Sequence, residues 1–138
     1  MLENDALLAK VSIIKNCLVS IEKYTELKIE SLANQLIQDA VVLNLERAIQ
    51  ACIDTANIVI SREGLKLPTS YKESFQILET NKIISQKTSA LLQKMTGFRN
   101  IAVHEYQEIN LEILKKIVSD HLIDFDQFNL EIAQYLKK

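Results

Sequence analysis

The stretch from Val41 to Ile60, VVLNLERAIQACIDTANIVI, decides the fold class. Its apolar residues recur every three or four positions, the spacing that places side chains on one face of an α-helix. A second apolar row runs beside the first, so this face is wide enough to contact two neighbouring helices at once. We therefore expect a central helix that ends near Gly64, because glycine is favoured just after a helix. The two rows are Val41, Leu45, Ala48, Cys52, Ala56 and Val59, and Val42, Ile49, Ile53 and Ile60.

The same helical period governs the chain before this stretch. A first helix is predicted from about Asn4 to Glu30, with Asn4 or Asp5 as its N-cap. The chain holds only two glycines and one proline, too few for a turn-rich β-fold. The inward row of this first helix is Leu7, Val11, Ile14, Leu18 and Ile21.

Three further helices are predicted after Gly64. Ser70 follows the only proline and is a suitable N-cap for a short helix from Tyr71 to Glu79. Another helix is predicted to begin near Asn81, and a last one after Asn110. The fold class is therefore expected to be all-α, an antiparallel up-and-down helical bundle of four long helices plus one short helix. We expect a single domain over residues 1–138.

Composition narrows the setting in which the protein works. The net charge of −2 and the pI near 5.7 show no global basic field that would attract nucleic acid. Cys17 and Cys52 lie inside apolar helical patterns, which indicates reduced core residues. No apolar run is long enough to span a bilayer, and the acidic N-terminus is unlike a signal peptide. We expect a cytoplasmic protein that does not contact a membrane.

A second stretch, GFRNIAVHEY from Gly97 to Tyr106, carries the residues best suited to chemistry. In HEYQE, a glutamate stands where a zinc-binding helix needs its second histidine. The two glycines are too far apart to form a phosphate-binding loop, and no nucleophile elbow is present. We therefore predict no metal site and no cofactor.

Arg99 and His104 remain, and together they suit cleavage of RNA through the ribose 2′-hydroxyl. The guanidinium fork matches phosphate oxygens, and an imidazole can give or take a proton near neutral pH. Five helical residues turn the chain by about 500°, so the two side chains would point roughly 140° apart on a regular helix. They can reach one ligand only if the helix ends or bends near Val103, or if a second copy of the chain contributes.

The segment RNIAVHEY resembles the R-x4-6-H signature of HEPN-domain ribonucleases, in particular the RN-x3-H-x-Y form of HepT-like toxins. The similarity extends to NLERAIQACIDTANIVISREGLKLPTSYKESFQIL. In members of that subfamily, E-R-A-x-Q, D-x-A-N and P-x-S-Y-x-[ED]-x-F segments recur in this region. MTGFRN matches the entry to the motif helix. The resemblance covers roughly Asn44 to Tyr106.

This resemblance implies a specific function. HepT-like proteins are toxins that act as metal-independent endoribonucleases on cellular RNA, tRNA or mRNA. They dimerise so that two R-x4-H motifs line a shared cleft. Their antitoxin is a minimal nucleotidyltransferase that adds AMP to the motif tyrosine (AMPylation). The implied partners are thus an RNA substrate, a second copy of this chain and that antitoxin, in a dimer or a larger hetero-oligomer.

The resemblance also implies a role for each motif residue. Arg99 would stabilise charge on the phosphate, and His104 would be the general acid or base. Asn100 would orient the scissile group or cap the helix. Tyr106 would be the residue that the antitoxin modifies, because an anionic adenylate there would occupy the phosphate site and repel RNA.

Two points stay open at the level of sequence. Glu46 and Asp54 match acidic positions of the family and would either orient Arg99 or be solvated acids on a polar face. The alternative function is a non-catalytic HEPN-type module that binds nucleotides or proteins, and a plain helical scaffold is a third possibility. The acidic balance of the chain leaves the RNA-binding surface unassigned.

Overall fold

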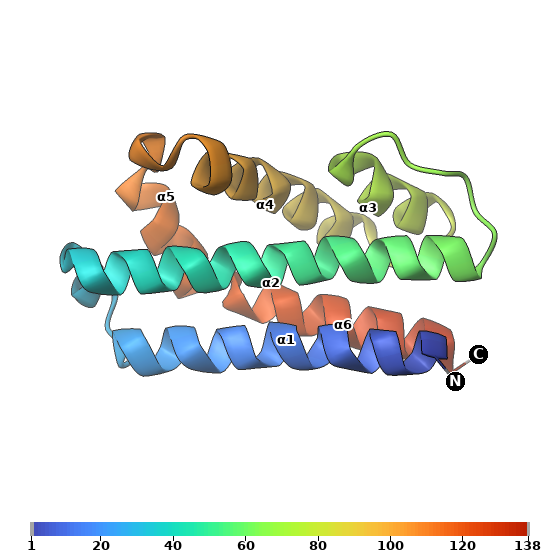
Figure 1. Cartoon of the computed structure of the whole chain (residues 1–138), viewed down its shortest axis with the longest axis horizontal. Coiled ribbons are helices and arrows are strands. Elements are labelled where there is room, and N and C mark those ends of the chain that lie inside the picture. The colour runs from blue at the N-terminus through green and yellow to red at the C-terminus, as the bar shows by residue number, and fades with distance from the viewer. Residues whose placement is uncertain (1, 138) are drawn as a thin grey trace.

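The computed structural model describes residues 2–137, and this part of the chain folds into six α-helices. Figure 1 shows α1 and α2 side by side and antiparallel, with α3 and α4 along the other edge of α2 and α6 beside α1. Three short segments connect these helices. A 3₁₀ segment joins α1 to α2 (Ile29–Ala33), and a second one follows α4 (Tyr106–Glu108). A π-helical segment joins α5 to α6 (Ile117–His121). The helices are α1 (Leu2–Thr25), α2 (Gln35–Arg62), α3 (Tyr71–Thr80), α4 (Gln86–His104), α5 (Leu111–Lys116) and α6 (Leu122–Leu136). The predicted all-α helical bundle is confirmed.

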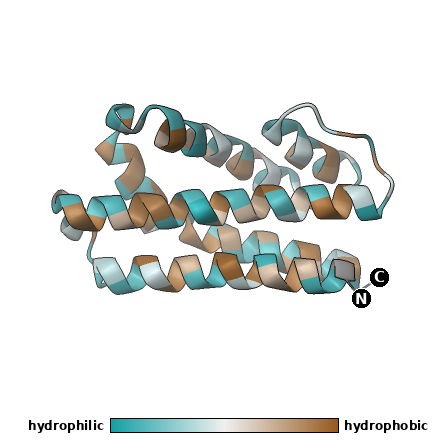
Figure 2. Cartoon of the chain, viewed as in Figure 1, coloured by the Kyte–Doolittle hydropathy of each residue, from teal (hydrophilic) through white to brown (hydrophobic). Residues whose placement is uncertain are grey.

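Helix α2 is the centre of the bundle, as its sequence predicts. All ten apolar residues of its two rows are buried, and the helix packs against α1, α3, α4 and α6. Hydrophobic and hydrophilic residues alternate along the ribbon of α2 in Figure 2, as expected for a helix with one apolar and one polar face. Each large aliphatic side chain buried here stabilises the fold by about 1.5–3 kcal/mol. No helix within residues 2–137 combines the length and apolarity needed to cross a membrane.

Two phenylalanine rings join the α3 side of the bundle to α6. Phe75 of α3 and Phe128 of α6 are fully buried and meet edge to face, with ring centroids 6.0 Å apart and planes at 81°. Such a pair contributes about 0.5–1.5 kcal/mol beyond the area that it buries. Helix α3 is therefore held in place at its centre, which fixes the position of its exposed first turn.

The predicted helix ends at Gly64, Ser70 and Asn110 are confirmed. Gly64 follows α2 with φ of +64°, a conformation that costs glycine little. The Ser70 hydroxyl accepts a hydrogen bond from the N–H of Glu73 at 3.1 Å, and the Glu73 carboxylate accepts one from the N–H of Thr69 at 2.7 Å. These two bonds form a reciprocal cap for the start of α3.

The bounds predicted for the first helix were wrong at both ends. Helix α1 already includes Asn4 and Asp5, so neither is its N-cap; instead Asn4 Oδ1 accepts a hydrogen bond from Arg62 of α2 at 3.2 Å. The helix also ends earlier than predicted. Glu26 and Leu27 have φ of +51° and +62°, and this left-handed backbone cannot continue an α-helix.

The prediction that a helix begins near Asn81 was also wrong, because α4 starts only after its N-cap Ser85. The intervening residues form a turn in which the N–H groups of Ile83 and Ile84 both donate to the carbonyl of Leu78, at 2.8 and 3.4 Å. Both isoleucines are buried. Their spacing continues the helical pattern of apolar residues, which explains the wrong prediction. In the structure they pack the turn against the core.

The last predicted helix is interrupted by the π-helical segment Ile117–His121. On a regular helix the eight steps from Ile117 to Phe125 would turn about 800°, which leaves the two side chains roughly 80° out of phase. A π segment accommodates an extra residue and removes about 100° of that rotation. Ile117 and Phe125 are consequently both buried.

Candidate active-site groove

An open groove of about 770 Å³ lies between the start of α3 and the C-terminal half of α4. One wall comes from the end of the α2–α3 connection and the first turn of α3, and the other wall comes from α4. The two predicted motif residues, Arg99 and His104, both line it. The lining residues are Thr69, Ser70, Tyr71 and Lys72 on one wall, and Thr96, Arg99, Asn100, Val103 and His104 on the other.

Both motif residues belong to α4, and His104 is the last residue of that helix. The helix stops at His104, and the N–H of Glu105 donates to the carbonyl of Ile101 at 2.8 Å as the chain turns away with φ of −141°. The helix thus ends one residue after Val103, which is one of the two conditions that the sequence left open. Arg99 and His104 occupy opposite edges of the α4 wall, since Asn100 and Val103 fill the arc between them. A ligand that contacts both must span the groove.

The Arg99 guanidinium is fixed from two directions. Its carbon lies 5.2 Å from the centroid of the Tyr71 ring, within the range of a cation–π interaction. Its Nη1 donates a hydrogen bond to Asn100 Oδ1 at 3.1 Å. Arg99 Nε is buried and has no hydrogen-bond partner within residues 2–137. The side chain is thus oriented while retaining donors for an incoming oxygen.

The groove is locally basic although the chain is acidic overall. Lys72, Arg99 and His104 lie along it, and no aspartate or glutamate is among its lining residues. Within the described chain no carboxylate forms an ion pair with Lys72 or Arg99. An anionic ligand would therefore meet cations whose charge is not already compensated by an adjacent acid.

Tyr106 lies just beyond α4 and is held by α2 rather than by the groove. Its hydroxyl donates a hydrogen bond to Asp39 Oδ1, which also accepts one from Gln35 Nε2 at 2.8 Å. Burial and the adjacent carboxylate raise the pKa of Tyr106 to about 12. The hydrogen bonds from Tyr106 and Gln35 lower the pKa of Asp39. At neutral pH the phenol is therefore neutral and the carboxylate is ionised, and 40% of Tyr106 remains exposed.

The sequence left open whether Glu46 and Asp54 orient Arg99 or are solvated acids, and in the described chain neither contacts Arg99 through an ion pair. Asp54 Oδ2 accepts a hydrogen bond from Lys10 of α1 at 2.9 Å, and Asp54 Oδ1 accepts one from Gln50, also at 2.9 Å. Asp54 instead ties α1 to α2, because it sits on the face of α2 that is turned towards α1.

Comparison with known proteins assigns the chain to a family. The family profile described as Ribonuclease HepT-like matches residues 14–132. The chain belongs to the HepT-like ribonuclease family. A relative from Shewanella oneidensis, the mRNA nuclease HepT, is 42% identical over 125 residues, which are 91% of this chain and 94% of the relative. A putative RNase, YutE from Bacillus subtilis, is 26% identical over 89 residues, 64% of this chain and 62% of the relative.

A solved structure closely matches this HepT-like chain. It is the tri-AMPylated HEPN toxin of Shewanella oneidensis in complex with its MNT antitoxin, at a TM-score of 0.89 and 40% identity. The match covers 94% of this chain and 98% of the toxin. The structure of Bacillus subtilis YutE gives a TM-score of 0.85 at 19% identity over 97% of this chain and 90% of YutE, which shows a shared fold.

Two residues that line the groove of this HepT-like chain, Tyr71 and Lys72, and one residue outside it, Asp39, were not singled out from the sequence. Tyr71 and Lys72 were read as the start of a short helix, although they lie inside the family-like segment PTSYKESF. That likeness was the available signal. No sequence signal pointed to Asp39, because an isolated aspartate in the first turns of a long helix has the pattern of an ordinary solvated residue.

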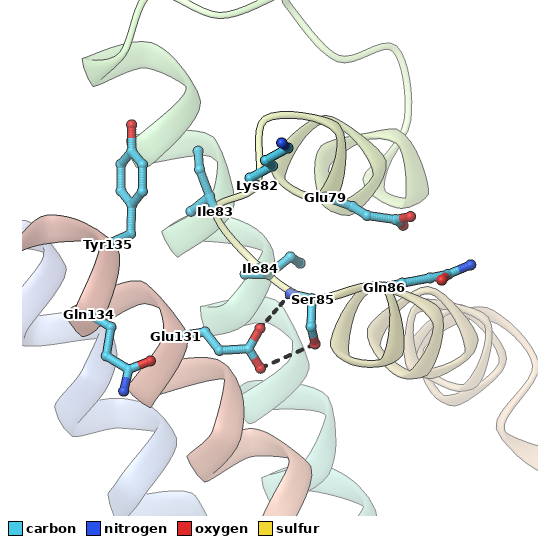
Figure 3. Close-up of a pocket in the computed structure, with 9 residues that line it drawn as sticks. All are labelled: Glu79, Lys82, Ile83, Ile84, Ser85, Gln86, Glu131, Gln134 and Tyr135. Carbon is cyan, nitrogen blue, oxygen red and sulfur yellow. Dashed lines mark hydrogen bonds between the residues drawn. The ribbon is translucent and has the colours of Figure 1, made fainter. Parts of the chain in front are cut away.

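A second groove of the HepT-like chain, at the opposite end of α4, is structural. Figure 3 shows the Glu131 carboxylate of α6 accepting hydrogen bonds from the N–H and the hydroxyl of Ser85. It also accepts a hydrogen bond from the Thr88 hydroxyl at 2.5 Å. Glu131 thereby anchors the first turn of α4 to α6. Within residues 2–137, no cluster of three or more histidine, cysteine, aspartate or glutamate side chains could hold a metal ion.

Proposed function

We propose that this chain is an endoribonuclease toxin that cleaves cellular RNA, tRNA or mRNA, without a metal ion. The observation that carries the proposal is the composition of the groove. It combines an oriented guanidinium, an exposed imidazole and a lysine, and it has no lining carboxylate. Membership of the HepT-like ribonuclease family and the naming of a 42% identical relative as an mRNA nuclease support the same conclusion.

The proposed reaction needs only side chains of this kind. A base takes the proton of the ribose 2′-hydroxyl, whose oxygen attacks the adjacent phosphorus, and an acid protonates the departing 5′-oxygen. Arg99 stabilises the negative charge that builds up on the phosphate oxygens. His104 acts as the acid or the base, and Lys72 holds a neighbouring phosphate of the strand. Asn100 keeps Arg99 in position through their hydrogen bond.

A second copy of the chain would complete the site. Each groove contains one imidazole, whereas the reaction uses both an acid and a base. In a homodimer whose grooves face each other, His104 of each copy would supply one of the two. The exposed apolar side chains of Ile101 and Val103, beside the motif residues, are suited to such an interface.

We further propose that a cognate minimal nucleotidyltransferase silences the toxin by attaching AMP to Tyr106. The related toxin of Shewanella oneidensis is AMPylated and bound to an MNT antitoxin. Tyr106 is partly exposed and lies two residues after His104, which lines the groove, so an adenylate there would bring negative charge close to the basic groove. That charge would repel RNA.

The test is cleavage of purified tRNA and mRNA in buffer with EDTA by the wild-type chain and by Arg99→Ala and His104→Ala variants. We expect wild-type cleavage and a loss of about 100-fold or more in each variant, the usual size for removing an acid–base group or a charge-stabilising one. The products should end in 2′,3′-cyclic phosphates, because the attacking oxygen is the 2′-hydroxyl.

Matched controls separate the motif from the rest of the chain. His121→Ala removes the other histidine, which pairs with Asp124 outside the groove, and Arg62→Ala removes an arginine that contacts Glu63 and Asn4. Both should cleave RNA as wild type does. Cleavage that survives His104→Ala would overturn the site assignment. Absence of cleavage by unmodified wild-type protein would favour a non-catalytic HEPN binding module.

A further inference from the structure

We propose that Asp39 is the proton acceptor for adenylylation of Tyr106, so that the toxin supplies the base for its own silencing. This inference rests on the proposed function, in which Tyr106 is the residue modified. Its starting point is the hydrogen bond that Tyr106 Oη donates to Asp39 Oδ1 across the gap between the end of α4 and the start of α2.

The reaction requires a base at this position. The phenol oxygen of Tyr106 attacks the α-phosphorus of a nucleoside triphosphate held by the partner enzyme, the bond to the β-phosphate breaks, and pyrophosphate leaves. The proton of the phenol must go to an acceptor. At neutral pH Tyr106 does not ionise unaided, because burial and Asp39 raise its pKa to about 12.

Asp39 has the properties of that acceptor. It is ionised at neutral pH, because the ordinary pKa of an aspartate is near 4 and hydrogen bonds from Tyr106 and Gln35 lower the pKa of Asp39 further. Its carboxylate receives the phenolic proton directly, so transfer needs no rearrangement of the toxin. Gln35 donates to the same carboxylate oxygen at 2.8 Å and holds Asp39 towards Tyr106. Asp39 is also solvent-exposed, so the proton can pass on to water.

The chemistry confines the role of Asp39 to the first AMP. The Tyr106 oxygen can be esterified only once, so any further AMP unit is attached at another hydroxyl. The tri-AMPylated relative shows that a toxin of this family can carry three. Loss of Asp39 should therefore slow the first addition and leave later additions to already modified chains unchanged.

The experiment compares Asp39→Asn, Asp39→Ala and Asp39→Glu in complex with the cognate nucleotidyltransferase and ATP. Intact mass spectrometry follows each AMP addition, and Tyr106→Phe provides the unmodifiable control. Asparagine can still accept the hydrogen bond from Tyr106 but cannot take its proton at neutral pH. We expect about tenfold or greater slowing of the first addition in both Asn and Ala variants, and partial recovery with Glu.

The outcomes show whether Asp39 acts as a base or only holds the Tyr106 ring in place. If Asp39 only held the ring, Asp39→Asn would be modified as fast as wild type. It could even be modified faster, because loss of the carboxylate lowers the pKa of Tyr106 towards its ordinary value. Either result would overturn the inference. Failure of the wild-type chain to be modified at Tyr106 would instead refute the proposed mode of silencing, and the inference with it.

RNA cleavage by the same samples provides a check on folding. Asp39 does not line the groove, so unmodified Asp39→Asn protein should cleave RNA at the wild-type rate. When antitoxin and ATP are added, wild-type cleavage should stop within minutes whereas the variant should stay active about tenfold longer. A variant that is silenced as quickly as wild type would contradict the role given to Asp39.

Discussion

Replacing Tyr71 with alanine tests how the groove positions its arginine. The Tyr71 ring lies 5.2 Å from the Arg99 guanidinium, and 40% of the residue is exposed. A cation–π contact contributes about 0.5–1 kcal/mol at an exposed site and about 2 kcal/mol when desolvated. Since Tyr71 is partly exposed and Arg99 Nε is buried, we take about 1 kcal/mol, which corresponds to roughly a fivefold loss in kcat/KM.

The assay is kcat/KM for cleavage of one short RNA by four single variants and one double variant. Tyr71→Phe keeps the ring and should stay within about twofold of wild type, whereas Tyr71→Ala should lose about fivefold. Tyr24→Ala, at an exposed tyrosine on α1, is the matched control and should have no effect. The fourth single variant is Arg99→Ala, and it is combined with Tyr71→Ala.

The double variant decides whether Tyr71 acts through Arg99. If it does, adding Tyr71→Ala to Arg99→Ala should cause little further loss, because the group that the ring positions is already gone. Full additivity would refute this reasoning and would indicate that Tyr71 contacts RNA directly. A Tyr71→Phe variant as poor as Tyr71→Ala would show that the hydroxyl, rather than the ring, matters.

Three predictions concern stability, each measured as the free energy of unfolding in denaturant. Phe75→Ala should cost about 3–5 kcal/mol, because it removes a fully buried ring that contacts Phe128. Gly64→Ala should cost about 1 kcal/mol because of its φ of +64°, whereas Gly97→Ala, inside α4 with open space around the new methyl group, should gain up to about 1 kcal/mol. Burial opposes ionisation of Glu131, but hydrogen bonds from Thr88 and Ser85 outweigh it and lower its pKa. A carboxyl group with a lowered pKa stabilises the fold above its unfolded pKa, so the loss caused by Glu131→Gln should be full near pH 7 and disappear as the pH falls below about 4.

Each of these predictions has a result that would contradict it. Equal changes for Gly64→Ala and Gly97→Ala would show that backbone conformation does not set the difference. A Phe75→Ala variant with wild-type stability would mean that the core refills the space. A Glu131→Gln deficit that stays constant between pH 7 and pH 3 would show that hydrogen bonding to the ionised carboxylate is not the source of its contribution.

Helix ends could be predicted from the sequence wherever a single residue determines the local backbone conformation. Gly64, Ser70 and Asn110 mark helix ends through their own backbone or side-chain chemistry, and all three predictions were correct. The start of α4 was missed because Ile83 and Ile84 continue the helical period while they pack a turn. Periodicity alone cannot separate these two uses of an apolar pair.

At the candidate site, the motif could be recognised from the sequence and its surroundings could not. Arg99 and His104 were recognisable because their types and spacing resemble a family signature, and they share one groove. Tyr71 and Asp39 were not recognised, because each meets its partner only through tertiary packing, from α3 and from α2. The role of Asp54 stayed open for the same reason, since a sequence does not show which face of α2 meets α1.

The contrast between a basic groove and an acidic chain has a kinetic consequence. Charges in solution are screened beyond about 8 Å at physiological ionic strength, so an RNA strand does not feel the cations of the groove until it is nearly in contact. At longer range it meets a chain with a net charge of −2, which offers no steering. On the proposed function, capture of RNA would be slow and dependent on chance encounter. A slow encounter rate would lower the damage done by the few toxin molecules that escape their antitoxin.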